Sequence, residues 1–226
     1  MKHPNAVYYG LLIALILFNF LIYVTPLLGM GGYAIAPTLY LGFSATCHQL
    51  DSRSLCVYPG GPHDFFHISS CTPETGTLEL GKHDVVVSQY GTGYKLPVCS
   101  RDVSIYLAML VGTIIFPFFY RLDSKCLPDK WLLIAAAIPI GLDGGIQFLS
   151  DIGLAPFMYE STNLIRLITG GLIGIVIPFF LIPILNIIYS SITSKSAGGE
   201  EKGRPVRQAG RAKPGHARGS HPKKAR

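Results

Sequence analysis

At 226 residues the chain has the length of one domain, but its apolar residues are grouped into long runs separated by short polar joints. This pattern excludes a soluble globular core and indicates an integral membrane protein. The formal net charge of +6 is uneven, because residues 195–226 hold ten Lys/Arg against two Glu, while residues 1–194 hold more acidic than basic side chains. The basic balance therefore describes a solvated tail and says little about the folded body.

The first apolar run, residues 7–28, predicts a transmembrane helix. No Asp, Glu, Lys or Arg occurs from His3 to Leu50, and the 22 residues of this run span about 33 Å at about 1.5 Å per residue. A cleaved signal peptide is the alternative. However, Lys2 is the single Lys or Arg before the run, and the run is long for the apolar part of such a peptide. We therefore expect the helix to remain in the protein.

The next apolar run, residues 33–46, is too short to cross a membrane and is interpreted as a re-entrant or interfacial segment. Residues 50–98 form the largest polar region and predict a small loop domain, with a β-hairpin between residues 77–80 and 85–90. Three more transmembrane helices are predicted by the apolar runs at residues 103–120, 131–149 and 164–192. The fold class is thus an all-α membrane protein with four transmembrane helices, the short segment and the loop domain, and the membrane domain covers residues 1–194.

Two features of the later runs concern helix packing. Prolines interrupt them at Pro117, Pro139 and Pro178, which a membrane helix tolerates when neighbouring groups satisfy the freed carbonyls. Gly170 and Gly174 have the four-residue spacing of small residues at which membrane helices pack closely. We expect this glycine face to contact another helix.

The distribution of basic residues predicts the orientation in the membrane. The joint at residues 121–130 has three basic residues, whereas the joint at residues 150–162 has Asp151 and Glu160 and no Lys or Arg. Because basic loops stay in the cytoplasm, the tail at residues 195–226 is expected to be cytoplasmic and the loop domain at residues 50–98 extracytoplasmic. We expect the tail to be disordered and to contact anionic lipid headgroups of the bilayer rather than nucleic acid.

The cysteines fit this topology. Four of the five fall on the expected extracytoplasmic side, at Cys47, Cys56, Cys71 and Cys99, and Cys126 lies on the other side. Four thiols allow three pairings. We favour Cys56 with Cys71, because they bracket one loop, and Cys47 with Cys99, because that bond would tie two helix ends.

Metal binding and thiol redox chemistry are alternatives for the second cysteine pair. Zinc is the metal that the residue types favour, since its candidate ligands are Cys47, His48, Cys99 and Asp102. No standard zinc-ligand spacing and no Cys-x-x-Cys motif is present, so neither alternative has a motif in its support.

Ionisable side chains at the expected outer ends of the helices predict a functional site. A charge inside a membrane costs a few kcal/mol or more, so such groups are functional candidates. Asp143 and Arg166 lie inside predicted helices, and we expect them to face each other as an ion pair. The candidate catalytic residues are His48, Arg101, Asp102, Asp143 and Arg166. The candidate supporting residues are Gln49, Arg53, Gln147 and Asn163.

Taken together, these segments resemble an uncharacterised family of small prokaryotic, often archaeal, membrane proteins. The resemblance rests on Cys-His-Gln at residues 47–49, Pro-Val-Cys-x-Arg at residues 97–101 and Asp-Gly-x-x-Gln at residues 143–147, and extends to about Gly174. It implies no known activity. Two segments depart from the family pattern: the insert that contains Cys56, and the basic tail.

Two functional hypotheses follow from the candidate site. In the first, the protein is a membrane-embedded enzyme that acts at the outer face on a lipid or lipid-linked substrate. Arg101 and Arg166 would hold an anionic group, and His48 or Asp143 would transfer a proton. In the second, the protein is a non-enzymatic transporter or structural subunit that binds an ion or a metal at the same cluster.

Overall fold

The structure, a computed structural model, describes residues 5–47, 50–60, 65–71, 84–88, 91–154 and 157–201, without the side chains of residues 195–201. The helices are α1 (Ala6–Met30), α2 (Ala36–Ser44), α3 (Ser100–Ile115), α4 (Lys130–Asp151) and α5 (Asn163–Glu201). The strands are β1 (Leu55–Pro59), β2 (Phe66–Ser70), β3 (Val85–Ser88) and β4 (Gly91–Lys95). Two short 3-10 turns are η1 (Asp51–Arg53) and η2 (Phe116–Phe118). The chain divides into two compact units, Met1–Tyr189 and Ser190–Arg226, and the arrangement below concerns the first.

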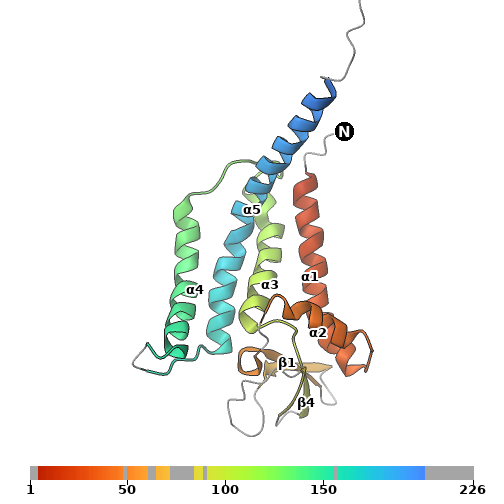
Figure 1. Cartoon of the computed structure of the whole chain (residues 1–226), viewed down its shortest axis with the longest axis vertical. Coiled ribbons are helices and arrows are strands. Elements are labelled where there is room, and N and C mark those ends of the chain that lie inside the picture. Colours follow the sequence, from red (N-terminus) through yellow and green to blue (C-terminus); the bar gives the residue numbers. More distant parts are fainter. Residues whose placement is uncertain are drawn as a thin grey trace, which may run out of the picture. The chain divides into compact units, whose positions relative to one another are not determined.

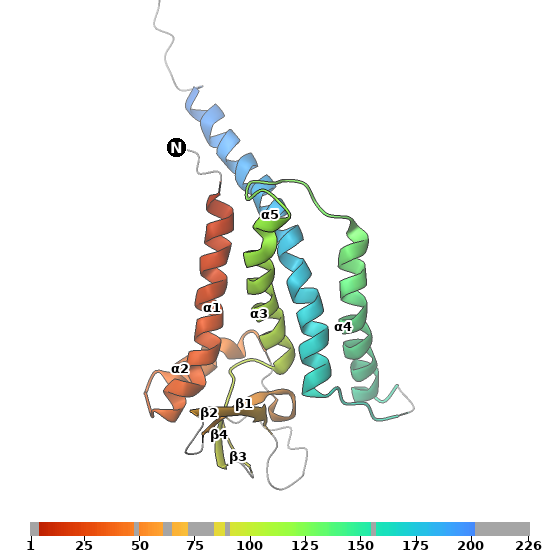
Figure 2. The ribbon, with the colours of Figure 1, turned by 180° about the vertical axis from the view of Figure 1, so that it is seen from behind.

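Four described helices are long and apolar enough to cross a membrane, and they coincide with the four long runs of the sequence. They are α1, α3 continued by η2, α4, and α5 as far as Ser194. In Figures 1 and 2, α3 lies between α1 and α5, and α4 stands beside α5. α2 has nine residues, about 14 Å of helix, so it is too short to cross a bilayer alone. α5 continues to Glu201, so the start of the segment expected to be disordered is helical, while residues 202–226 lie outside the described part.

α5 packs directly against α3 at the two glycines that the sequence singled out. A Cβ on Gly170 would lie 2.3 Å from Ser104 Oγ and 2.6 Å from the Arg101 carbonyl oxygen. A Cβ on Gly174 would lie 2.5 Å from the Ile105 carbonyl oxygen. Both distances to backbone oxygens are shorter than any real contact, so a larger side chain would force the helices apart. The close packing predicted for this face is therefore present.

The loop domain is a four-stranded antiparallel sheet in the order β2-β1-β4-β3, which is larger than the hairpin predicted beside the four helices. The expected hairpin partner at residues 77–80 lies outside the described residues. β3 instead pairs with β4, from Val85 opposite Tyr94 to Ser88 opposite Gly91. Cys56 of β1 and Cys71, directly after β2, form the expected disulfide. Residues 50–98 therefore contain a sheet where the sequence indicated one hairpin.

One apolar cluster attaches the sheet to the helices. Its buried members come from α1, α2, β1, the connection after β4, and α3: Ile22, Phe43, Val57, Leu96, Val98 and Val103. Because these elements share one cluster, the sheet is fixed at one end of the helices, here called the sheet end (Figure 1). The sheet end contains the last residues of α1 and α4 and the first residues of α3 and α5.

A buried ion pair reinforces this attachment. Lys95 Nζ lies 2.7 Å from Asp51 Oδ1, and the exposed fractions of the two side chains are 0% and 4%. The Tyr40 hydroxyl of α2 donates to the Lys95 carbonyl at 2.5 Å. The last residue of β4 is therefore held by both η1 and α2.

The glycine contact predicts opposite effects at two adjacent positions. Gly170→Ala should lower the free energy of unfolding by about 1–3 kcal/mol, because its methyl group has no space against α3. Gly171→Ala is the matched control, since a Cβ there meets nothing within 4 Å and alanine favours helix by about 1 kcal/mol. Thermal unfolding in detergent, followed by circular dichroism, measures both variants. Equal stability of the two would contradict the packing described.

The buried ion pair predicts a second stability effect. Lys95→Met should cost about 3–5 kcal/mol, because it leaves the Asp51 carboxylate buried without its counterion. The double variant Lys95→Met/Asp51→Leu should recover much of this loss. Arg121→Gln is the control, because Arg121 pairs with Asp123 while 88% exposed, and such pairs contribute about 0–1 kcal/mol. The same unfolding measurement applies, and a Lys95→Met variant as stable as the control would show that the pair does not hold the sheet.

Candidate functional site

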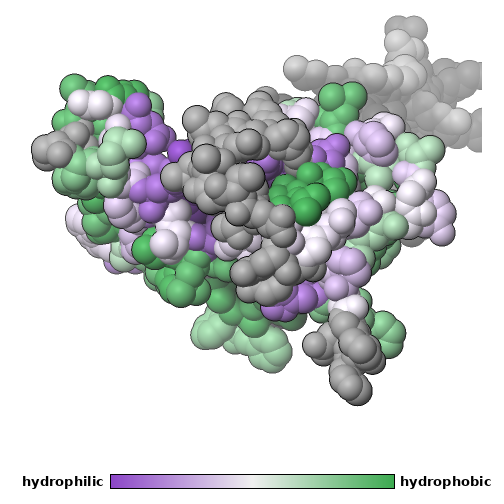
Figure 3. Space-filling model, turned by 90° about the horizontal axis from the view of Figure 1, so that it is seen from below, coloured by the Kyte–Doolittle hydropathy of each residue, from purple (hydrophilic) through white to green (hydrophobic). Residues whose placement is uncertain are grey.

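A cavity of about 380 Å³ opens at the sheet end, where the segments that contain Cys47 and Cys99 meet. Its lining residues come from the segment after α2, from η1, and from α3, α4 and α5: Thr46, Cys47, Leu50, Arg53, Cys99, Arg101, Asp102, Gln147 and Arg166. Figure 3 views the molecule from this end, where hydrophilic surface lies between apolar surfaces. Three of the lining side chains are guanidinium groups and one is a carboxylate, so basic groups dominate the lining.

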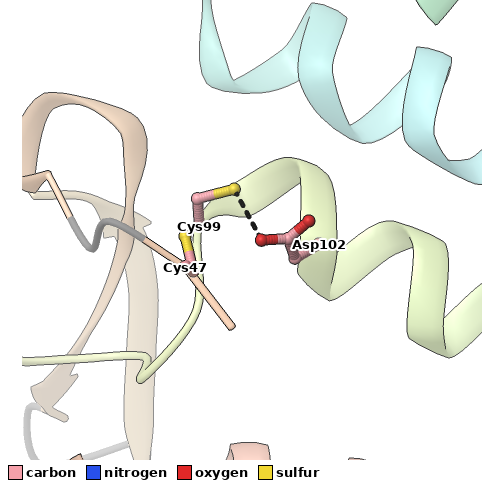
Figure 4. A group of neighbouring side chains, drawn as sticks. All are labelled: Cys47, Cys99 and Asp102. Carbon is pink, nitrogen blue, oxygen red and sulfur yellow. Dashed lines mark hydrogen bonds between the residues drawn. The ribbon is translucent and has the colours of Figure 1, made fainter. Parts of the chain in front are cut away.

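The start of α3 brings a thiol and a carboxylate together. Cys99 is the N-cap residue of α3, and Asp102 lies in its first turn, where a negative charge is favoured by the helix dipole. The three-residue spacing places both side chains on one side of the helix, and the Cys99 thiol donates to Asp102 Oδ2 at 3.2 Å. Cys47, which follows α2, points toward them (Figure 4). Its sulfur, the Cys99 sulfur and an Asp102 oxygen all lie within 4.8 Å of one another.

The expected disulfide between Cys47 and Cys99 is not formed, and this prediction is corrected: neither residue is disulfide-bonded. A hydrogen bond with Cys47 raises the pKa of the Cys99 thiol, and burial and the nearby Asp102 charge raise this pKa further. The Cys99 side chain therefore stays a protonated thiol at neutral pH in the absence of a metal. A protonated thiol is a poor nucleophile, so this environment gives no support to thiol redox chemistry.

Asp143 pairs with Arg101, and the expected pairing of Asp143 with Arg166 is wrong. Arg101 Nη2 donates to Asp143 Oδ2 in a short contact. α4 has a glycine beside this pair: a Cβ on Gly144 would lie 3.2 Å from Arg101 Nη1, so the guanidinium packs closely against the α4 backbone. Tyr159, from the α4–α5 connection, donates to Asp143 Oδ1 at 2.8 Å, and this bond raises the pKa of the tyrosine. No motif had indicated Tyr159.

Arg166 is buried, and its hydrogen-bond partner in the described residues is a neutral amide. Its exposed fraction is 3%, and its Nη2 donates to the neutral Gln147 Oε1 at 3.0 Å. Among the residues that the structure describes, no carboxylate lies within 4.0 Å of its guanidinium. The Arg166 Nε and the Gln147 Nε2 are both buried without a hydrogen-bond partner in that part of the chain. An unpaired buried charge is costly, so this group is suited to an anion that enters the cavity.

The other two arginines of the cavity have acidic partners but keep donors free. Arg53 Nη2 lies 3.2 Å from Asp151 Oδ2, and its Nε lies 3.9 Å from Glu160 Oε1, a distance too long for a hydrogen bond. Within the described part of the chain, the buried Nε atoms of Arg53 and Arg101 have no hydrogen-bond partner. The guanidinium groups that line the cavity therefore keep N–H groups without a partner in the described residues, but these Nε atoms are themselves buried.

The remaining predicted residues divide into two groups. Asn163 does not line the cavity: it accepts from Ser100 Oγ at 2.7 Å and donates to Ser70 Oγ at 3.0 Å and to the Ser54 carbonyl at 3.3 Å. It therefore connects α5 with α3 and the sheet. His48 and Gln49 lie outside the described residues, and their roles stay predictions.

Comparison with known proteins agrees with this architecture. Residues 88–180, which contain most of the cavity's charged residues, match the family described as predicted membrane protein (DUF2085). The chain is also similar to an uncharacterized protein of Methanocaldococcus jannaschii (MJ1492), with 31% identity over 183 residues that cover 78% of this chain and 91% of that protein. No solved structure matches the chain. The resemblance seen in the sequence is confirmed, and the chain belongs to the DUF2085 family of predicted membrane proteins.

Proposed function

We propose that the protein is a membrane-embedded enzyme whose cavity binds the anionic headgroup of a lipid or lipid-linked substrate at the extracytoplasmic face. The observation that carries this proposal is Arg166, a buried guanidinium with a neutral partner, in a cavity that two further arginines line. Guanidinium groups bind phosphate and carboxylate groups through paired hydrogen bonds. An anionic headgroup would supply the counterion that Arg166 lacks within the described residues.

Arg101 and Arg166 have different tasks in this proposal. Asp143 engages Nη2 of Arg101, which fixes the guanidinium and leaves its Nε as a free donor. Gln147 fixes Arg166 in the same way through one Nη2 bond. Both groups are thus held in position before the ligand arrives, which lowers the entropic cost of binding. Asp143 and Gln147 act as positioning residues, so the proton-transfer role expected for Asp143 is not part of the proposal.

The surroundings of the cavity favour a lipid over a small soluble anion. The volume of about 380 Å³ falls at the lower end of the range for ligand pockets, roughly 300–1,000 Å³, and is suited to a headgroup. Ile146 and Ile165, the sequence neighbours of Gln147 and Arg166, are 37% and 38% exposed. Acyl chains attached to a bound headgroup would find apolar helix surface at the same level.

The catalytic step is assigned to the carboxylate of the cavity. Asp102 lines the cavity and accepts a hydrogen bond from the Cys99 thiol, so its carboxylate is placed to accept a proton from a bound substrate or water. His48 is the second candidate for proton transfer on the sequence alone. The non-enzymatic alternative, a transporter or structural subunit, would bind the same anion and release it unchanged.

Removal of the Arg166 charge tests the binding proposal. Arg166→Gln should weaken retention of phosphatidylglycerol by the purified protein about tenfold or more, because a charged hydrogen bond contributes about 1.5–3 kcal/mol. Native mass spectrometry in detergent measures the retained lipid, with phosphatidylcholine of the same acyl chains as the uncharged comparison. Arg121→Gln is the control, because Arg121 is exposed and lies outside the cavity lining. Equal retention by the parent and Arg166→Gln, or no preference for the anionic lipid, would contradict the proposal.

The proposed face of the membrane is tested by cysteine labelling. Phe65, directly before β2, is 98% exposed, and Cys126 is an exposed free thiol. A membrane-impermeant maleimide on intact cells should label a Phe65→Cys variant and should reach Cys126 after permeabilisation alone. The control is the same Phe65→Cys chain with Cys126→Ser, which should lose the second signal. Labelling of Cys126 in intact cells would reverse the orientation.

A further inference from the structure

We infer that Cys47, Cys99 and Asp102 form a zinc site with three protein ligands and an open coordination position toward the cavity. The three residues come from two segments that are far apart in the sequence and meet beside the first turn of α3 (Figure 4). Thiolate and carboxylate groups are both zinc ligands, and three protein ligands with one open position are the arrangement of catalytic zinc sites.

The spacing of the ligand atoms fits a tetrahedral zinc ion. Zinc–sulfur bonds of about 2.3 Å and zinc–oxygen bonds of about 2.1 Å at tetrahedral angles place two sulfurs about 3.8 Å apart and a sulfur and an oxygen about 3.6 Å apart. In the structure the Cys99 sulfur and Asp102 Oδ2 are 3.2 Å apart, and all three ligand atoms lie within 4.8 Å of one another. Shifts of less than about 1 Å in side-chain positions bring them to zinc distances.

The charges around the three residues also suit the metal-bound form. Two thiolates, one carboxylate and Zn²⁺ have a net charge of about −1, because both cysteines lose their protons on binding. Arg53, Arg101 and Arg166 line the same cavity and stabilise this negative charge. All three ligand residues are partly exposed, so an ion can reach them from the cavity.

A redox-active thiol pair is the competing explanation. Oxidation of Cys47 and Cys99 to a disulfide would transfer two electrons to an oxidant and release two protons. The structure favours the metal for two reasons. A disulfide needs no third group, whereas Asp102 is held in contact with the Cys99 sulfur. In addition, Cys56 and Cys71 in the adjacent sheet are joined by a disulfide, while Cys47 and Cys99 are not disulfide-bonded.

The inference rests on ligand geometry and is independent of the proposed lipid substrate. It is connected with the proposed function at two points: the ligand residues and the three arginines line the same cavity, and Asp102, the proton acceptor of the metal-free site, would instead hold the metal. A bound zinc would polarise water or an anionic oxygen there.

Metal titration of the full chain tests the site. The protein is purified in detergent with reductant, stripped with a chelator, and titrated with Zn²⁺ alone and with Co²⁺ alone. We expect one zinc per chain by elemental analysis. Co²⁺ should give a near-ultraviolet thiolate-to-cobalt band with the intensity of two thiolates and a visible spectrum typical of tetrahedral cobalt.

Variants separate this site from other metal binding. Cys47→Ser and Cys99→Ser should each lower zinc affinity about 100-fold and weaken the cobalt band. Asp102→Asn, which keeps the side-chain shape, should lower zinc affinity at least tenfold and leave the two-thiolate band in place at saturating Co²⁺. Cys126→Ser is the control and should bind like the parent, because Cys126 is a free, exposed cysteine outside the cavity lining. If the cysteine variants do not fold, the parent cobalt spectrum and Asp102→Asn decide the question.

Three results would overturn the inference. The first is a reduced parent chain that binds no zinc. The second is zinc affinity that is equal in the parent, Asp102→Asn and a cysteine variant, which would show adventitious binding elsewhere. The third is a cobalt spectrum without a thiolate band. Phosphatidylglycerol retention is measured on the same preparation, so loss of the zinc site with normal lipid retention refutes this inference and leaves the proposed function standing.

Discussion

The direct contact between α3 and α5 positions two of the three arginines that line the cavity, Arg101 and Arg166. Gly170 of α5 packs against the backbone of Arg101 in α3. Because Gly170 has no side chain, the two helices approach closely, and the guanidinium groups of Arg101 and Arg166 both line the cavity. Two guanidinium cations held this close repel each other unless negative charge lies nearby. Asp143 compensates Arg101, whereas Arg166 receives the neutral Gln147 oxygen. This imbalance is the basis of our proposal that the cavity binds an anion.

The same contact explains why the sheet lies beside the cavity. Asn163, in the first turn of α5, forms hydrogen bonds with Ser100 in the first turn of α3. It also bonds to Ser54, directly before β1, and to Ser70 at the end of β2. The first turns of both helices are therefore tied to the sheet. The sheet in turn is held by the Cys56–Cys71 disulfide and by the buried Lys95–Asp51 pair. These bonds fix the backbone segments that carry Cys47, Cys99 and Asp102.

Much of the helical architecture could be predicted from the sequence, because long apolar runs and the spacing of two glycines are local signals. The pairing of Asp143 with Arg101 could not be predicted in this way. Spacing along one helix determines which residues share a face, but it does not determine how two helices rotate about each other. The room that Gly144 leaves for Arg101 depends on that rotation. The proximity of Cys47 and Cys99 was inferred from their places at helix ends, but the preference for a disulfide overlooked Asp102 as a hydrogen-bond acceptor.

The sheet was underestimated for a different reason. β4 contains Gly91 and Gly93, which are typical of turns, yet Gly93 is required inside the strand because its missing Cβ leaves room for the ring of Tyr58. Such a contact between strands far apart in sequence has no local signal. Tyr159 was overlooked in the same way, since its bond to Asp143 spans the turn between α4 and α5.

The central claim is that the cavity at the sheet end receives an anion at Arg166. The most direct measurement is an experimental structure of the protein in nanodiscs that contain phosphatidylglycerol, at a resolution that shows headgroups. The account predicts density for the phosphate group in the cavity, within hydrogen-bond distance of the guanidinium groups of Arg101 and Arg166, with the acyl chains along α4 and α5. A cavity that holds water alone, or an Arg166 guanidinium paired with a carboxylate of the protein, would contradict it.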